Sequence, residues 1–279
     1  MTIYYFVIKP LQINTATGST GVVLNSPGAD SPVVQSIFAD FRTNLTNLFD
    51  QAKRYIPHAS SRSITIDVRE IPSVAGNPTS PDFSGLSINI NEPIVYFTVR
   101  ELNERPSDPT DRRPEFIMME SLRNARVQEF PDSWVQQQRE VLRHAGERSG
   151  LSVPGISGVS FPAIACVFSN ARQNFEASNW QELLAMNLAT TAFHEIAHCK
   201  AETDNRNNNS RWRNALTDSI HSVSGVSILA SDGIGRTPST EDYQLMGQHM
   251  LCPINFYRLD QNIEDQCFSN GSIVTLTPR

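Results

Sequence analysis

One segment of this 279-residue chain constrains its fold more than any other, because residues 180–201 contain neither glycine nor proline. Ser178 and Gln181 stand at the start of this segment with the spacing of a capping box, in which side chains satisfy the free backbone N–H groups of the first helical turn. The sequence therefore predicts a long, uninterrupted helix from Trp180 to about Ala201.

This helix carries the motif His194-Glu195-Ile196-Ala197-His198. Histidines at positions i and i+4 lie one above the other on a helix face, so both imidazoles can reach one zinc ion, and the adjacent glutamate can act on a metal-bound water. Asn187 and Thr191 extend the two histidines into a polar stripe beside apolar neighbours, which indicates a cleft. A plain surface helix is the alternative, and it predicts more lysine and arginine than this stretch contains.

Composition excludes several classes of protein. The chain is 39% hydrophobic and 19% charged, so it can bury a sizeable core and does not need a bound metal or disulfide bonds to stabilise its fold. A formal net charge of −6, with no basic run longer than Arg112-Arg113, argues against a nucleic-acid or anionic-membrane surface. We expect no membrane insertion, because no apolar stretch approaches the roughly 20 residues that span a bilayer. The apolar segment 3–8 is also too short for a signal peptide.

Four cysteines are too few for a disulfide scaffold in a chain of this length. Cys252 and Cys267 flank a predicted loop and could pair in an oxidising compartment, which the sequence leaves open. Cys166 lies in an apolar run and is expected to be a small buried hydrophobic residue.

The rest of the chain alternates strand and helix signals. Ser31 and Pro32 have the preferences of an N-cap and a first helical residue, and apolar residues then recur at helical spacing to about Ile56. From hydrophobic periodicity we expect strands at 2–8, 63–69, 86–99, 161–168 and 273–276. The same periodicity predicts helices at 134–145, 212–221 and 241–251. Turn residues predict loops or irregular segments up to Asp30 and at 72–84, 101–114, 204–210 and 225–238.

The HExxH helix resembles the active-site helix of the zincin metallopeptidases, in which the two x positions are apolar, as Ile196 and Ala197 are. The resemblance implies an α+β fold: a twisted mixed sheet packed on helices, an edge strand that binds extended substrate, and a mostly helical C-terminal part. It implies Zn²⁺, one ion per chain, with His194 and His198 as ligands and Glu195 as the general base. We expect a single domain over 1–279, in which 1–201 hold the sheet and active-site helix and 202–279 supply the third ligand.

Three carboxylates compete for that third position. Zincins of the gluzincin subgroup take a ligand from a later helix, which favours Glu241, although acidic residues in a first helical turn also simply complement the helix dipole. Asp204 is in register with the metzincin subgroup, but Ala201 replaces the glycine at which that helix ends, at a cost on the order of 1 kcal/mol. Asp218 is a further alternative. The sequence leaves all three open, with Glu241 preferred.

The resemblance also implies a group that stabilises the negatively charged oxygen that develops on the scissile carbonyl. Candidates after the motif are Tyr243, His221, His249 and Tyr257, and the sequence selects none of them. Met246 or Met250 could lie beneath the metal, although a methionine on a helix face is more often part of the core.

The expected function is zinc-dependent endopeptidase activity on a peptide or protein substrate. The chain further resembles the metallopeptidase toxin domain at the C-terminus of some bacterial type VI secretion spike proteins. That resemblance implies secretion as part of a larger protein, delivery to the periplasm of a target cell, and an immunity protein as partner.

A host-directed secreted protease and a non-catalytic module with a structural metal are the alternatives. Structural zinc sites often use thiolates, but Cys199 adjoins His198 and points off its face.

Overall fold

The computed structural model describes residues 1–7, 12–14, 21–23, 32–88, 92–98, 150–153, 156–160, 178–201 and 238–251. The main element of this described part is a five-stranded sheet of order β4-β1-β7-β9-β8. Its strands are β4 (Asp67–Glu70), β1 (Thr2–Val7), β7 (Ile94–Thr98), β9 (Ile156–Ser160) and β8 (Gly150–Val153). The first four are parallel, and β8 pairs with β9 in the antiparallel direction at the edge. The protein is thus of mixed α/β structure with a largely parallel sheet.

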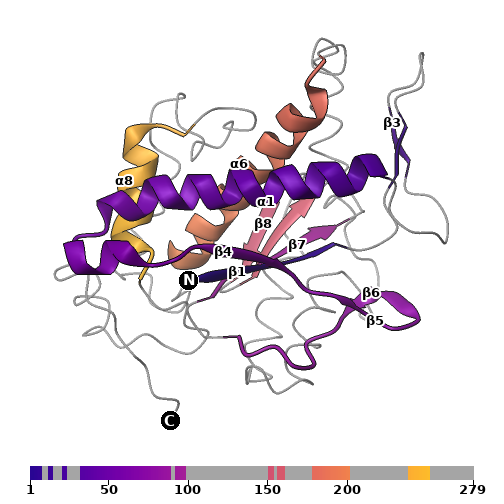
Figure 1. Cartoon of the computed structure of the whole chain (residues 1–279), viewed down its shortest axis with the longest axis horizontal. Coiled ribbons are helices and arrows are strands. Elements are labelled where there is room, and N and C mark those ends of the chain that lie inside the picture. The colour runs from indigo at the N-terminus through magenta and orange to yellow at the C-terminus, as the bar shows by residue number, and fades with distance from the viewer. Residues whose placement is uncertain are drawn as a thin grey trace, which may run out of the picture.

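Among the described residues, three α-helices accompany the sheet: α1 (Pro32–Ala52), α6 (Trp180–Ala201) and α8 (Thr240–His249). Helix α1 lies between the parallel strands β1 and β4 in the sequence, and it packs against α6. Figure 1 shows α1 crossing α6 in front of the sheet, with α8 beside the C-terminal end of α1. Two short 3₁₀ helices, η1 (Lys53–Tyr55) and η2 (Ala59–Ser63), follow α1. In the part of the chain that the structure describes, no helix has the length and apolar character needed to cross a membrane.

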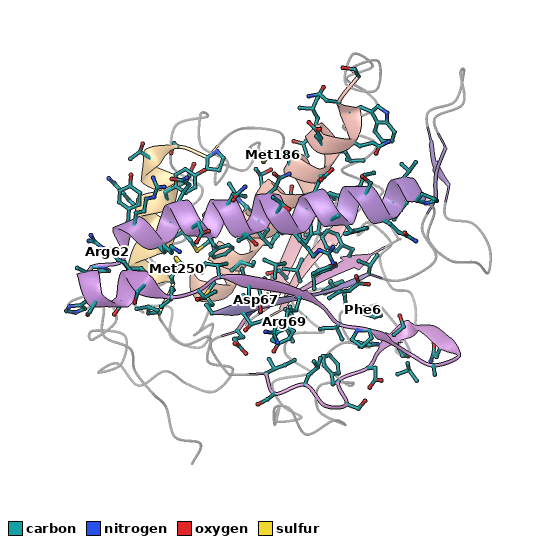
Figure 2. The ribbon with its side chains drawn as sticks, in the orientation of Figure 1. Phe6, Arg62, Asp67, Arg69, Met186 and Met250 are labelled. Atoms are coloured by element: carbon teal, nitrogen blue, oxygen red, sulfur yellow. The ribbon has the colours of Figure 1, made fainter. Side chains whose placement is uncertain are left out.

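The core lies between the helices and one face of the sheet. Alternate residues of β1, namely Ile3, Tyr5 and Val7, belong to one buried cluster with apolar side chains of α1 and α6. Four aromatic rings form its centre, with ring centroids 4.9 to 6.3 Å apart: Tyr5, Phe38, Phe41 and Phe97. The alternating residues Tyr4 and Phe6 are also buried, and Phe6 is labelled in Figure 2. Burial on both faces is typical of parallel strands.

Several predicted elements are confirmed. The first strand ends at Val7, α1 begins at Pro32 as expected, and α6 has the predicted bounds. Helix α8 occupies 240–249 rather than 241–251. These segments have strong local signals, namely β-branched and aromatic runs or helical periodicity with capping residues.

Other predicted bounds are wrong. The strand expected over 63–69 begins only at Asp67, because pairing with Thr2 of β1 starts there. Ser63 belongs instead to η2, and residues 64–66 are in neither element. Of the strand expected over 86–99, residues 86–88 and 92–93 are not strand, since pairing with β1 begins at Ile94.

Two hairpins stand where loops were expected. In the predicted loop 72–84, β5 (Ser73–Val74) pairs with β6 (Asn77–Pro81) through a turn in which Gly76 has φ +77°. Glycine adopts that conformation without steric cost, so the turn depends on it. In the predicted loop before Asp30, β2 (Gln12–Asn14) pairs with β3 (Gly21–Val23). Backbone pairing overrides the loop-like composition in both places. The segments predicted at 101–114, 134–145, 161–168, 204–210, 212–221 and 273–276 lie outside the described residues.

Candidate metal site

Helix α6 runs without interruption through the HExxH motif. His194 is partly exposed, whereas Glu195 is only 7% exposed. His198 follows one turn later on the same helix, about 6 Å further along the axis at 1.5 Å per residue. Continuity of the helix places both histidine positions on one face, as the spacing predicts, while the side chain of His198 lies outside the described residues.

The predicted polar stripe holds in part. Asn187 is partly exposed like His194, but Thr191 is buried and its hydroxyl donates to the backbone carbonyl of Asn187 at 2.8 Å. Thr190 donates to the same carbonyl at 3.1 Å. The two threonines therefore satisfy their hydroxyl groups within the helix. Nearer the N-terminus of α6, Met186 is 40% exposed and is labelled in Figure 2.

The residue before the motif, Phe193, is fully buried and touches two other helices. Its ring lies 5.0 Å from that of Phe49 in α1 and 6.2 Å from that of Tyr243 in α8, with both pairs steeply inclined. Burial and the negative charge of Asp242 raise the pKa of Tyr243 above its usual value. Tyr243 therefore keeps its proton at neutral pH and can act as a hydrogen-bond donor.

Helix α8 also carries Glu241, the preferred third ligand, in its first turn, and the side chain of Glu241 lies outside the described residues. Its neighbour Asp242 is 1% exposed and accepts a hydrogen bond from the backbone N–H of Ser239 at 2.6 Å. The hydroxyl oxygen of Ser239 accepts from the Asp242 N–H in return, which completes a capping box. The structure thus assigns Asp242 a helix-capping role.

The remaining sequence candidates divide into two groups. Met246 and Met250 are buried in the core, which is the commoner role for methionine on a helix. The side chains of the other candidates lie outside the described residues: Asp204, Asp218, His221, His249, Tyr257, Cys166, Cys199, Cys252 and Cys267.

Sequence reasoning missed the strands nearest to the motif helix. Helix α6 contacts both β9 and the antiparallel edge strand β8. These strands are joined by Pro154-Gly155, a dipeptide that marks turns, between short runs with alternating apolar residues. That turn signal was the available clue to the hairpin.

The donor types of the motif fit zinc, because two imidazoles one helical turn apart supply nitrogen ligands with the spacing of many zinc sites. Among the side chains that the structure describes, no group of three or more histidine, cysteine, aspartate or glutamate residues is placed to hold a metal ion. The described part of the site is thus His194 and Glu195 on α6, the helix that contacts β9 and the edge strand β8. No protein-family model matches the chain, and no curated protein or solved structure is significantly similar to it.

Proposed function

We propose that the protein is a zinc-dependent endopeptidase. The observation that carries this proposal is the HExxH motif on one unbroken helix, with His194 partly exposed and Glu195 held in a mostly buried position beside it. The position of α6 against an antiparallel edge strand supports it, because the zincin resemblance implies a motif helix and an edge strand in the same fold.

The chain's own residues have distinct roles in this proposal. His194, His198 and a third ligand hold the metal, and this third ligand is a carboxylate, for which Glu241 is preferred. When bound, zinc would polarise the scissile carbonyl and acidify a water molecule. Glu195 takes the proton from the attacking water and delivers it to the leaving amine, so that one carboxylate serves as base and then as acid. Burial of Glu195 favours this role, because a packed side chain keeps one orientation during both transfers.

Extended peptide is the substrate class that the sheet edge suits. Within the sheet that the structure describes, β8 is the edge strand, and an edge strand presents backbone N–H and C=O groups that can pair with an added strand. In this proposal β8 aligns the substrate backbone beside α6, which it contacts.

Metal content tests the proposal. We expect zinc at about one ion per chain in the purified protein, and its loss in His194→Ala, because removing one imidazole leaves too few ligands. The large core should keep that variant folded, which circular dichroism checks. Wild-type protein that stays folded and takes up no zinc when it is supplied would refute the proposal.

The same measurement identifies the third ligand. Zinc content is compared among Glu241→Ala, Asp204→Ala and Asp218→Ala, and we expect the loss in Glu241→Ala alone. Loss in one of the other two variants would transfer the assignment to that residue.

We further propose, on the type VI resemblance, that the peptidase is a secreted antibacterial toxin domain that acts in the periplasm and is neutralised by an immunity protein. Expression in a bacterium with a periplasmic export signal should arrest growth, and expression without the signal should not. The Glu195→Gln variant, exported in the same way, is the matched control. Equal growth of the cells that export wild type and variant would contradict the toxin proposal and leave the peptidase proposal in place.

A further inference from the structure

We propose that Phe193 is a positioning residue for the metal motif and that it is held by Phe49 of α1 and Tyr243 of α8. We refer to these three residues as the aromatic clamp. The proposal rests on the proposed function, because it assumes that the neighbouring histidines bind zinc. It adds that α8 influences zinc affinity through a contact with the core side of α6, in addition to any ligand that α8 supplies.

The clamp joins three helices at one ring. Phe193 is fully buried, with Phe49 at 5.0 Å and an interplanar angle of 62°, and Tyr243 at 6.2 Å and 68°. Both are edge-to-face arrangements, which aromatic pairs prefer and which depend on ring orientation. Phe193 is therefore restrained by neighbours from two elements that are distant from α6 in the sequence.

Restraint of Phe193 fixes the direction of His194. Successive residues of an α-helix are separated by about 100° around its axis, so a ring held against the core sets where the next side chain points. His194 is partly exposed, while Phe193 is buried. Rotation of α6 that displaced Phe193 would turn both histidine positions by the same angle, away from a third ligand that another part of the chain supplies. A metal site keeps its affinity only within a narrow range of ligand geometry.

Helix α8 is itself firmly placed, which makes it an effective support for the clamp. Its N-terminus is closed by the capping box of Ser239 and Asp242. Met246 and Met250 are buried in the shared core, and Gly247 approaches the end of α1 closely. Docking of α8 and zinc binding should therefore stabilise each other, since coupling between two sites is reciprocal.

Zinc affinity of the full-length variants tests the clamp, measured by competition with a chromophoric chelator. We expect Phe193→Leu and Tyr243→Leu to bind zinc about tenfold more weakly or worse, the range seen when a group that orients a metal ligand is removed. Tyr243→Phe should bind as tightly as wild type, because it keeps the ring and loses only the hydroxyl.

Phe38→Leu is the matched control. Phe38 packs on Tyr5, Phe41 and Phe97 in the same core, and these three residues belong to β1, α1 and β7. We expect it to lower the free energy of unfolding, followed by urea denaturation, without changing zinc affinity. A purely structural role of Phe193 and Tyr243 would make their leucine variants behave in the same way.

The outcomes separate the two proposals. If wild type binds zinc, and Phe193→Leu and Tyr243→Leu bind it as tightly as Phe38→Leu does, the clamp is overturned while the peptidase proposal stands. If wild type binds no zinc, the peptidase proposal fails and the clamp fails with it. Should Phe193→Leu not fold, the comparison of Tyr243→Leu with Tyr243→Phe decides, because Tyr243 is only partly buried.

Discussion

Replacement of Glu195 by glutamine is expected to lower peptidase activity by about 10²–10⁴-fold, the contribution typical of a positioned general acid–base group. The amide has almost the shape of the carboxylate but cannot accept the proton of the attacking water. Hydrolysis of a casein-type or quenched fluorescent peptide substrate measures the effect. Zinc content should stay at the wild-type level, because Glu195 is not assigned as a ligand.

The combination of lost activity and retained zinc is what identifies a general base. Glu195 is mostly buried, so the unfolding free energy of the variant must be measured alongside. His194→Ala is the contrasting variant, since it should lose both zinc and activity. Substantial hydrolysis by a folded, zinc-loaded Glu195→Gln protein would remove Glu195 from the mechanism.

Replacement of Gly247 by alanine is expected to destabilise the fold by about 1–3 kcal/mol, the usual cost of overpacking. A Cβ atom at this position would lie 2.2 Å from the carbonyl oxygen of Ala52 and 2.8 Å from Cβ of Tyr55. The first of these is a backbone atom, so a side-chain rotation cannot relieve the clash. Helix α8 would have to move away from the end of α1.

The sign of the change in unfolding free energy decides this test. Within a helix, glycine to alanine ordinarily stabilises by roughly 0.5–1 kcal/mol, so the close approach and the helix propensity predict opposite outcomes. Urea unfolding of Gly247→Ala measures the balance. Gln244→Ala, at an exposed position of the same helix, is the control and should stay within about 0.5 kcal/mol of wild type. A stabilised Gly247→Ala protein would show that α8 does not lie this close to α1.

The peptidase proposal and the aromatic-clamp proposal give α8 different roles. Glu241 would supply a metal ligand from the first turn of α8, whereas Tyr243 would act from the core side through Phe193. Glu241→Ala changes the first and leaves the aromatic clamp intact, while Tyr243→Leu does the reverse. Because Gly247 sets how closely α8 packs, Gly247→Ala should also weaken zinc binding if the aromatic clamp operates.

Local signals were enough to predict the elements that carry the motif. The helix over 180–201 follows from a run without glycine or proline, and the start of α1 follows from Ser31 and Pro32. HExxH specifies its own geometry once it lies on a helix, because spacing alone sets which side chains share a face. The sequence could therefore place His194, Glu195 and the position of His198 relative to one another.

Tertiary structure decided the surroundings of that motif. Only strand pairing shows that β4 begins at Asp67, that β8 is the antiparallel edge, and that both hairpins form in segments with loop-like composition. Only packing shows that Phe193 meets Phe49 and Tyr243, and that Gly247 is required where α8 crosses the end of α1. Helix formation depends on residues within a few positions of one another, whereas the parallel strand pairings and the ring contacts join residues far apart in the chain. A single sequence does not encode those long-range contacts in any local pattern.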